Sequence, residues 1–492
     1  MKVCFINPPF KSKYGKFSRE SRSPSIGHSG VLYYPLWLIY AAALAEQDEF
    51  EIAFIDAPAK RLDEKQTMER VKKEAADAKL FVLDTSTPSI YSDVAFGAKL
   101  KKHYSGSKVM LVGTHPSVMD VETLEMNGAI DFAARREYDS IVLETARALR
   151  DGVPVSAVKG LTYREYADGA EGAVIKRNPD AGYIEDLDRI PMAAPFIRKY
   201  LDVRDYVFPA ASYPAIQIFT GRGCPAHCSF CVYPQTLHGH RYRLRTPEHV
   251  AAEFRYIADH FPEVREVVIE DDTFTANRQR VLEICSLLIR DGLHKRLRWL
   301  CNARVNLDLE TMRAMKKAGC HLIIPGFESY NEEILKNIKK GSSRKLIDAY
   351  VSNARKAGLM IHACYMVGNQ GETRQTMENT LRAAMRFKTD TAQFFPLIPY
   401  PGTEAWEWAK KNGYISGRYE DYLQEDGTLN CVLNTPDLSA EELVEFCSYA
   451  RKKYYVRPWY LMHRLWRGVR DPQDLKRSWK AFWRLKDSLL KG

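Results

Sequence analysis

The residues of this 492-residue chain that could do chemistry gather in one stretch, residues 221–245, with the sequence GRGCPAHCSFCVYPQTLHGHRYRLR. Cys224, Cys228 and Cys231 stand there with three and then two residues between them. Thiolates this close in sequence can share one metal centre only if the backbone turns tightly, which the neighbouring glycines permit. A [4Fe–4S] cluster usually takes four thiolates, so three without a nearby fourth predict a cluster with one iron open to an external ligand.

Two other kinds of site fit three cysteines. With His227, His238 or His240 they could form a Cys3His zinc site, and the C-x-x-C part could be a redox pair. Zinc sites favour two ligand pairs separated by a long spacer, and no closing pair follows this stretch. We therefore prefer the cluster and keep a non-catalytic zinc protein as the remote alternative.

Composition indicates a globular protein with room for two or three domains, because 45% of the residues are hydrophobic and 27% are charged. The ten cysteines lack paired framework spacings, and no signal sequence is recognisable at the N-terminus. Both observations predict a reducing, cytoplasmic location, which suits an oxygen-sensitive cluster. The longest apolar run, residues 31–45, contains Pro35 and is shorter than the about 20 residues of a spanning helix, so it predicts a buried helix.

The net charge of +10 is concentrated in a tail, residues 451–492, which holds thirteen Lys or Arg and three Asp or Glu. Four of the eight tryptophans stand among these basic residues. Basic residues with interleaved Trp suit peripheral contact with an anionic membrane surface, here its inner face. Helices that cover the neighbouring domain are the simpler alternative. RNA binding is a third interpretation, without a recognised motif to accompany it.

Residues 1–150 alternate short apolar runs with helix-length segments, the runs being residues 2–7, 51–56, 80–85, 109–114 and 129–134. This alternation predicts an α/β fold with a doubly wound, Rossmann-like parallel sheet, which binds ligands at the carboxyl ends of its strands. Small residues suited to a bulky ligand stand at two of those ends, although they are also ordinary turn residues: Thr85, Ser86, Thr87, Gly113 and Thr114. Residues 151–210 predict a linker subdomain with a hairpin around residues 167–172.

Residues 211–405 contain a second series of six strand–helix units, which predicts a partial or complete β/α (TIM-like) barrel with its site at the carboxyl ends of the strands. The cysteine stretch follows the first of these strands. Polar residues follow the next three strands, and convergence at one barrel mouth favours a ligand site: Asp271, Asp272, Arg304 and Glu328. Residues 406–492 predict a helical C-terminal region.

The pattern C-x3-C-x-aromatic-C, with Phe230 before the third cysteine, resembles the signature loop of the radical S-adenosylmethionine (SAM) enzymes. Along residues 1–410 the chain resembles the cobalamin-binding radical SAM family. The segments YPQTLHGHRYRLRT, DTSTPS and DAPA further resemble proteins associated with hopanoid lipid biosynthesis.

The resemblance implies three cofactors, a [4Fe–4S] cluster, SAM and cobalamin, and assigns residues to each. Cys224, Cys228 and Cys231 would hold the cluster. Around SAM, Phe230 would lie near the adenine, Asp271 or Asp272 would face the amino group, Arg304 the carboxylate and Glu328 the ribose. The first sheet would bind cobalamin through Thr85, Ser86, Thr87, Gly113 and Thr114. No Asp-x-His-x-x-Gly motif occurs, so we infer cobalamin without a protein histidine on its lower face.

The implied activity is the formation of a 5′-deoxyadenosyl radical that takes hydrogen from an unactivated carbon. Either methyl transfer or a radical rearrangement, such as ring contraction, would follow on a small-molecule, polyol, sugar or lipid-linked substrate. A ferredoxin or flavodoxin is the expected electron donor. Nucleic acid is not expected as a partner, and an RNA-modifying radical SAM enzyme is kept as the alternative.

Overall fold

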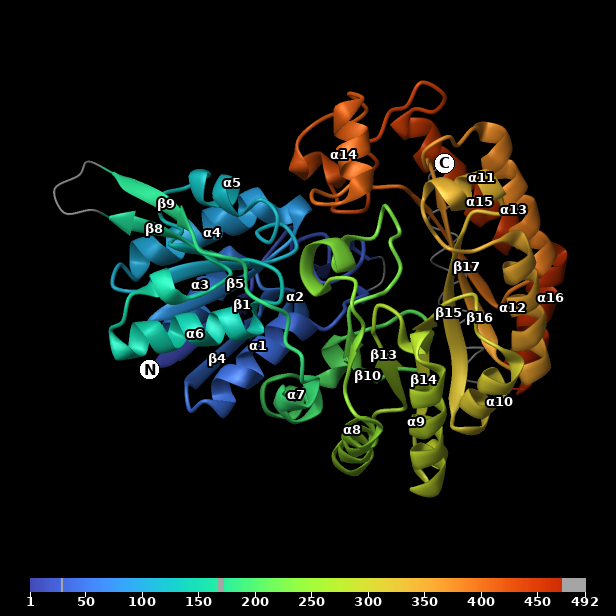
Figure 1. Ribbon diagram of the computed structural model, residues 1–492, viewed down its shortest axis with the longest axis horizontal. Helices are drawn as coiled ribbons and strands as arrows, with labels where there is room; N and C mark the ends of the chain where they lie inside the picture. Colours follow the sequence, from blue (N-terminus) through green and yellow to red (C-terminus); the bar gives the residue numbers. More distant parts are fainter. Residues whose placement is uncertain (28–29, 167–171, 471–492) are drawn as a thin grey trace.

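The computed structural model describes residues 1–27, 30–166 and 172–470. It contains two large sheets side by side, the N-terminal sheet on the left of Figure 1 and the second sheet on the right. The segment with the three cysteines, drawn in green, lies between them. One hydrophobic core runs through both halves, because helix α1 (Leu36–Gln47) and its neighbours share apolar contacts with the second sheet.

The first sheet has seven strands in the order β4-β1-β5-β6-β7-β8-β9. Its five parallel strands are β1 (Lys2–Asn7), β4 (Glu51–Asp56), β5 (Leu80–Thr85), β6 (Lys108–Gly113) and β7 (Phe132–Ala134). The doubly wound parallel sheet is thereby confirmed. Its strands are apolar and almost fully buried because helices cover both faces.

Two groups of helices cover this sheet. The buried run around Pro35 forms α1, and Pro35 directly precedes its first residue. Helix α1 packs with α6 (Tyr138–Asp151) in the large core. A second, smaller core lies under the other helices, which are α3 (Glu64–Glu74), α4 (Ile90–His103) and α5 (Asp120–Glu125).

A hairpin of β8 (Leu161–Tyr166) and β9 (Ala173–Arg177) extends the first sheet by antiparallel pairing of β8 with β7. The predicted hairpin is confirmed, but it was placed in a linker subdomain, whereas it belongs to the sheet. Pairing covers the edge that β7 would otherwise expose, which is the physical reason for the difference. The predicted turn of the hairpin, residues 167–171, lies outside the described residues.

The second sheet consists of six parallel strands in the order β10-β13-β14-β15-β16-β17. They are β10 (Ala215–Ile218), β13 (Glu266–Ile269), β14 (Arg298–Ala303), β15 (Cys320–Glu328), β16 (Met360–Val367) and β17 (Thr391–Pro396). Helices cover its outer face, namely α8 (Pro247–His260), α9 (Arg278–Arg290), α10 (Leu309–Lys317), α12 (Arg344–Ala357) and α13 (Arg374–Phe387) (Figure 1). No pairing joins β10 to β17 in the described chain, so the barrel is a partial one.

The remaining helices connect or cover the two halves. They are α2 (Ala57–Lys60), α7 (Ala193–Tyr200), α11 (Glu332–Asn337), α14 (Glu404–Lys411), α15 (Ala440–Tyr455) and α16 (Pro458–Arg470). The end of α15 is bonded to the barrel: Tyr454 donates to the carbonyl oxygen of Thr389 and Tyr455 to that of Ala392, both at 2.6 Å. The beginning of the basic tail therefore covers the barrel, as one alternative predicted.

The rest of the tail, residues 471–492, lies outside the described residues. Contact of the tail with a membrane therefore stays a prediction. None of the helices in the described ranges is long and apolar enough to cross a membrane.

Candidate active site

The three cysteines lie on a loop that begins after β10 and the short strand β11 (Gly221–Arg222), at the carboxyl end of the barrel. Cys224 and Cys228 are buried, and Cys231 is half-buried. Gly223 makes the entry turn with a φ of +89°, and a β-carbon there would lie 2.2 Å from the carbonyl oxygen of Arg241. Only glycine fits this turn without moving the backbone.

Side chains that follow the cysteines hold the carbonyl groups of the loop. The Nε2 atom of Gln235 lies 2.9–3.2 Å from the carbonyl oxygens of Cys228, Ser229 and Cys231. The Nδ1 atom of His240 lies 3.2 Å from the carbonyl oxygen of Cys224. Sequence analysis missed the role of Gln235, because a single amide side chain carries no signal by itself. These contacts fix the loop before any metal binds.

Each histidine of the zinc alternative has another partner. His227 stacks on His240 with ring centroids 4.1 Å apart. The Nδ1 atom of His238 lies 2.8 Å from Asp272. In the described part of the chain, no three His, Cys, Asp or Glu side chains converge on a single-ion site. The thiolates of a four-iron cluster bind different irons, so they need not converge on one ion.

Burial disfavours the free thiolate forms of Cys224 and Cys231. Burial raises the pKa of Cys224, and burial raises the pKa of Cys231 to about 12 despite the nearby Arg22. Cluster binding requires thiolates, so it displaces protons from these groups. A nucleophilic or redox role of free Cys224 and Cys231 is disfavoured because these two thiols stay protonated at neutral pH.

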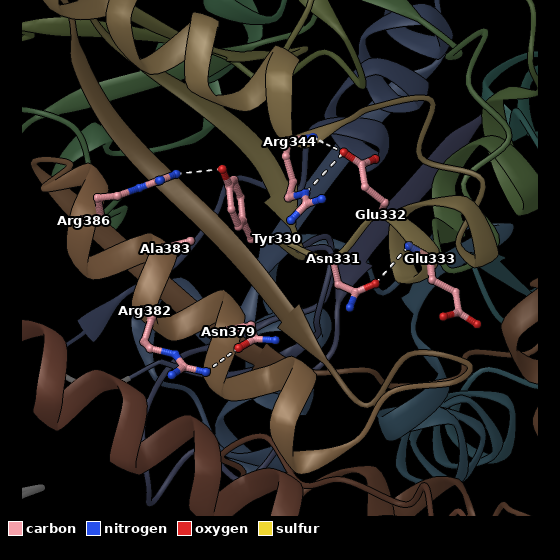
Figure 2. A pocket seen from close by; sticks show the side chains of 9 residues that line it. All are labelled: Tyr330, Asn331, Glu332, Glu333, Arg344, Asn379, Arg382, Ala383 and Arg386. Carbon is pink, nitrogen blue, oxygen red and sulfur yellow. Dashed lines mark hydrogen bonds and ion pairs between the residues drawn. The ribbon is translucent and has the colours of Figure 1, made fainter.

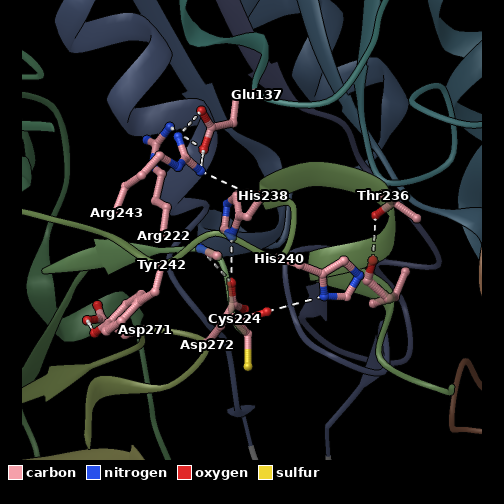
Figure 3. A network of polar contacts seen from close by, with 12 residues as sticks. Glu137, Arg222, Cys224, Thr236, His238, His240, Tyr242, Arg243, Asp271 and Asp272 are labelled. Carbon is pink, nitrogen blue, oxygen red and sulfur yellow. Dashed lines mark hydrogen bonds and ion pairs between the residues drawn. The ribbon is translucent and has the colours of Figure 1, made fainter. Parts of the chain in front are cut away.

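The two aspartates predicted near the SAM amino group have different surroundings (Figure 3). The carboxylate of Asp271 is fully engaged: it accepts bonds from the backbone N–H and the hydroxyl of Thr220, at 2.6 and 2.7 Å, and from Tyr242 at 3.0 Å. The Oδ2 atom of Asp272 contacts His238 and the backbone N–H of Gly223. Its Oδ1 atom is buried and has no hydrogen-bond partner among the described residues, and the guanidinium of Arg22 lies 3.7 Å from it. Asp272 therefore retains an oxygen that can accept a hydrogen bond from an ammonium group beside Arg22.

A change of Asp272 to Asn is expected to weaken SAM binding about 10- to 150-fold, because a hydrogen bond to a charged group contributes about 1.5–3 kcal/mol. Titration of the SAM-induced change in the electron paramagnetic resonance (EPR) spectrum of the reduced cluster measures this affinity. Asp271→Asn is the matched control and should lower thermal stability without a comparable loss of affinity. Equal losses of affinity in both variants would remove the distinction between the aspartates.

The other residues predicted around SAM surround Lys340. Its Nζ atom lies 2.7 Å from Glu328 and 5.6 Å from the ring centre of Phe230, and its carbonyl oxygen accepts from Arg304 at 3.0 Å. Glu328 has a positive φ of 57°, which turns its side chain out of the strand path. The structure thus brings Phe230, Arg304 and Glu328 together beside the cysteine loop. Their assignment to parts of SAM stays a prediction.

The five residues predicted to contact cobalamin also come together, because β5 and β6 pair in a register that sets Thr85 beside Gly113. Gly113 has a φ of +116°, and a β-carbon there would lie 2.2 Å from the carbonyl oxygen of Thr85. The hydroxyl of Thr85 is buried without a hydrogen-bond partner in the described chain. Ser86 and Ser89 bond each other, and Thr114 is half-buried. A buried hydroxyl without a partner, beside a glycine at the strand end, fits contact with a polar cofactor.

His115 belongs to the same edge but was not among the predicted contacts. It is fully buried, its Nδ1 atom lies 3.2 Å from Thr87, and its Nε2 atom has no partner in the described chain. Burial lowers the pKa of His115 to about 3, so the ring is neutral. The ring of Tyr419, from the C-terminal region, packs edge-on against the His115 ring, with 4.7 Å between the ring centres. The sequence placed this histidine in a turn without indicating its burial.

Arg22 connects the two halves at the site and was also missed. It lies in the long connection after β1, and its guanidinium is 3.7 Å from Asp272 and 5.2 Å from the ring centre of Tyr233. The cysteine loop and the connection after a cobalamin-sheet strand therefore meet at one place. The two residues of the Arg22–Asp272 pair are 250 positions apart, so no local pattern reveals them.

A hollow of about 630 Å³ lies outside the barrel between α11 and α13 (Figure 2). It holds three arginines, but each has a partner beside it. Arg386 contacts Tyr330 and Asp348, Arg344 lies near Glu332, and Arg382 bonds Asn379. Because these charges are paired on the surface, we assign the hollow no part in the reaction.

Comparisons with known proteins agree with this geometry. The model of the radical SAM superfamily matches residues 218–384, and the model of the B12 binding domain matches residues 23–145. An uncharacterized methyltransferase of Pyrococcus horikoshii is 29% identical over 462 residues, 93% of each chain. An anaerobic magnesium-protoporphyrin IX monomethyl ester cyclase of Cereibacter sphaeroides is 24% identical over 95% of this chain and 72% of its own length. The methyltransferase TsrM of Kitasatospora setae has the same fold, with a TM-score of 0.67 and 18% identity over 90% of this chain and 88% of its own.

The fold and the two matched regions define an enzyme with a radical SAM barrel and a cobalamin domain. The chain is thus a cobalamin-dependent radical SAM enzyme, and its cofactors are a [4Fe–4S] cluster, SAM and cobalamin. The finer resemblance to hopanoid proteins is weak: the hopanoid C-3 methylase of Methylococcus capsulatus is 27% identical over 46% of this chain and 42% of its own.

Proposed function

We propose that the protein is a methyltransferase that adds a methyl group to an unactivated carbon of a small-molecule, sugar or lipid-linked substrate. The cofactors supply the radical and the methyl carrier, while the chain orients them and keeps water out. The contact of Arg22 with Asp272 supports this proposal, because it joins the connection after β1 to a residue that itself bonds Gly223 and His238 beside the cysteines. Methyl transfer needs both cofactors within reach of one substrate carbon.

The names of the relatives favour methyl transfer over rearrangement, although they include enzymes of both kinds. A relative that aligns over 93% of both chains is a methyltransferase by name, and another long match is a cyclase. Ring formation on the same scaffold supports a radical rearrangement as the second candidate. A ferredoxin or flavodoxin is the electron donor we expect for either reaction.

Anaerobic turnover separates the two candidates. In methyl transfer, one SAM gives methionine and 5′-deoxyadenosine while a second SAM gives up its methyl group as S-adenosylhomocysteine. We therefore expect S-adenosylhomocysteine to form in step with product when the reconstituted enzyme is given SAM, a reductant and candidate substrates. Enzyme without cobalamin is the control and should form no methylated product. Product without S-adenosylhomocysteine would exclude methyl transfer.

A further inference from the structure

Four buried charges join the first sheet to the cysteine loop, and Figure 3 shows three of them, Glu137, Arg222 and Arg243. Arg222 contacts Asp139 through two bonds of 2.7 and 3.0 Å. Arg243 contacts Glu137 through two bonds of 2.7 and 2.6 Å. All four side chains are at most 4% exposed. Paired bonds of this kind fix orientation as well as distance.

The two arginines cannot be buried there without the acids. Arg222 in β11 and Arg243 in β12 (Arg243–Leu244) stand directly opposite each other in an antiparallel pair. Like charges in that arrangement repel. Glu137 is within reach of both, with 3.9 Å to Arg222, so it and Asp139 neutralise the pair. Both acids come from the N-terminal end of α6, where negative charge is also favoured by the helix dipole.

On one side the network reaches both ends of the cysteine loop. Arg222 stands two residues before Cys224. Arg243 also donates to the carbonyl oxygen of His238 at 2.8 Å, and the ring of His238 contacts Asp272. His238 ends the short helical turn that follows the cysteines. The acids of α6 therefore hold the loop before its first cysteine and after its last.

On the other side the network reaches the cobalamin edge. The backbone N–H of Arg136, next to Glu137, donates to the hydroxyl of Ser117 at 2.9 Å. The same hydroxyl donates to the carbonyl oxygen of Gly113 at 2.7 Å. A continuous series of contacts thus runs from Gly113 through the start of α6 to the cysteine loop.

We propose that Glu137 and Asp139 are positioning residues that set the distance and orientation between the cobalamin and the [4Fe–4S] cluster. A buried ion pair is weak evidence for stability alone, because apolar residues of similar volume often serve equally well. The pairs matter more for geometry than for stability, since a misplacement of reacting groups by about 1 Å can reduce a rate about 10²-fold. The proposal needs the two cofactors of the family and holds whether the reaction is methyl transfer or rearrangement.

The test measures the spacing of the cofactors directly. The full chain is reconstituted with iron, sulfide and hydroxocobalamin and then reduced, and pulsed EPR records the dipolar coupling between the cluster and Co(II). Glu137→Gln and Asp139→Asn are compared with wild type and with Asp131→Asn. Asp131 is the matched control because it is a buried acid of the same sheet that pairs with Lys101, at 2.8 Å, away from the interface.

We expect one narrow coupling in wild type and in Asp131→Asn, and a shifted or broadened coupling in the two interface variants. A wild-type coupling in both interface variants, at equal cluster and cobalamin content, would overturn the proposal. If those variants fail to retain both cofactors, Arg222→Lys and Arg243→Lys decide the question. Lysine keeps the charge but loses the paired geometry, so a wild-type coupling in both lysine variants would also overturn the proposal.

Discussion

Cys224→Ala is expected to abolish the cluster and, with it, the cleavage of SAM. The remaining two thiolates leave a second iron without a protein ligand, so iron content and the EPR signal of the reduced cluster should fall to background. Formation of 5′-deoxyadenosine should fall at least about 10³-fold, because the reaction has no other electron source in the protein. Anaerobic reconstitution followed by absorbance, EPR and product analysis measures all three.

Cys285→Ala is the matched control for this prediction. Cys285 lies in α9, is 2% exposed and belongs to the apolar core of the barrel. Its loss removes one small buried group and is expected to cost about 1 kcal/mol of stability without loss of iron. A normal cluster in Cys224→Ala would mean that other residues bind the iron and would contradict the site. Loss of iron in both variants would point to general damage to the fold.

The strands and the cysteine loop were predictable because their signals are local. Parallel strands buried on both faces are short apolar runs, and each run named in the sequence became a strand within a few residues. Cysteine spacing similarly reports a loop and its metal chemistry without reference to the rest of the chain. The hairpin of β8 and β9 was also predicted, but its membership of the sheet was not, because that depends on the free edge of β7.

The contacts of the site were less predictable because they join distant parts of the sequence. Lys340 bonds Glu328 and lies over the ring of Phe230. Nothing in the sequence around Lys340 indicates either contact. Which of Asp271 and Asp272 can accept a hydrogen bond from SAM depends on the bonds that each carboxylate already makes. Two adjacent aspartates look alike in the sequence, so the sequence does not distinguish them. The interface acids Glu137 and Asp139 are more than 80 residues from their arginines. Long-range pairing of this kind appears only when both sheets are in place.

Gly113→Ala is expected to remove most cobalamin binding while leaving the cluster intact. A β-carbon at this position would lie 2.2 Å from the carbonyl oxygen of Thr85, and its φ of +116° is a conformation that alanine rarely adopts. The strain costs about 1–3 kcal/mol or moves the end of β6, which separates the residues of the cobalamin edge. We expect hydroxocobalamin affinity to fall at least about tenfold, as measured by equilibrium dialysis of the reconstituted protein.

Gly106→Ala is the control for this change, because Gly106 precedes the same strand and a β-carbon there meets no atom within 4 Å. It should bind cobalamin as wild type does. The cluster signal should be normal in both variants, since the cysteine loop belongs to the second sheet and has its own supports in Gln235 and His240. Wild-type affinity in Gly113→Ala would place cobalamin away from the β5–β6 edge. Loss of both cofactors would show instead that strain at Gly113 reaches the cysteine loop through Ser117 and the start of α6.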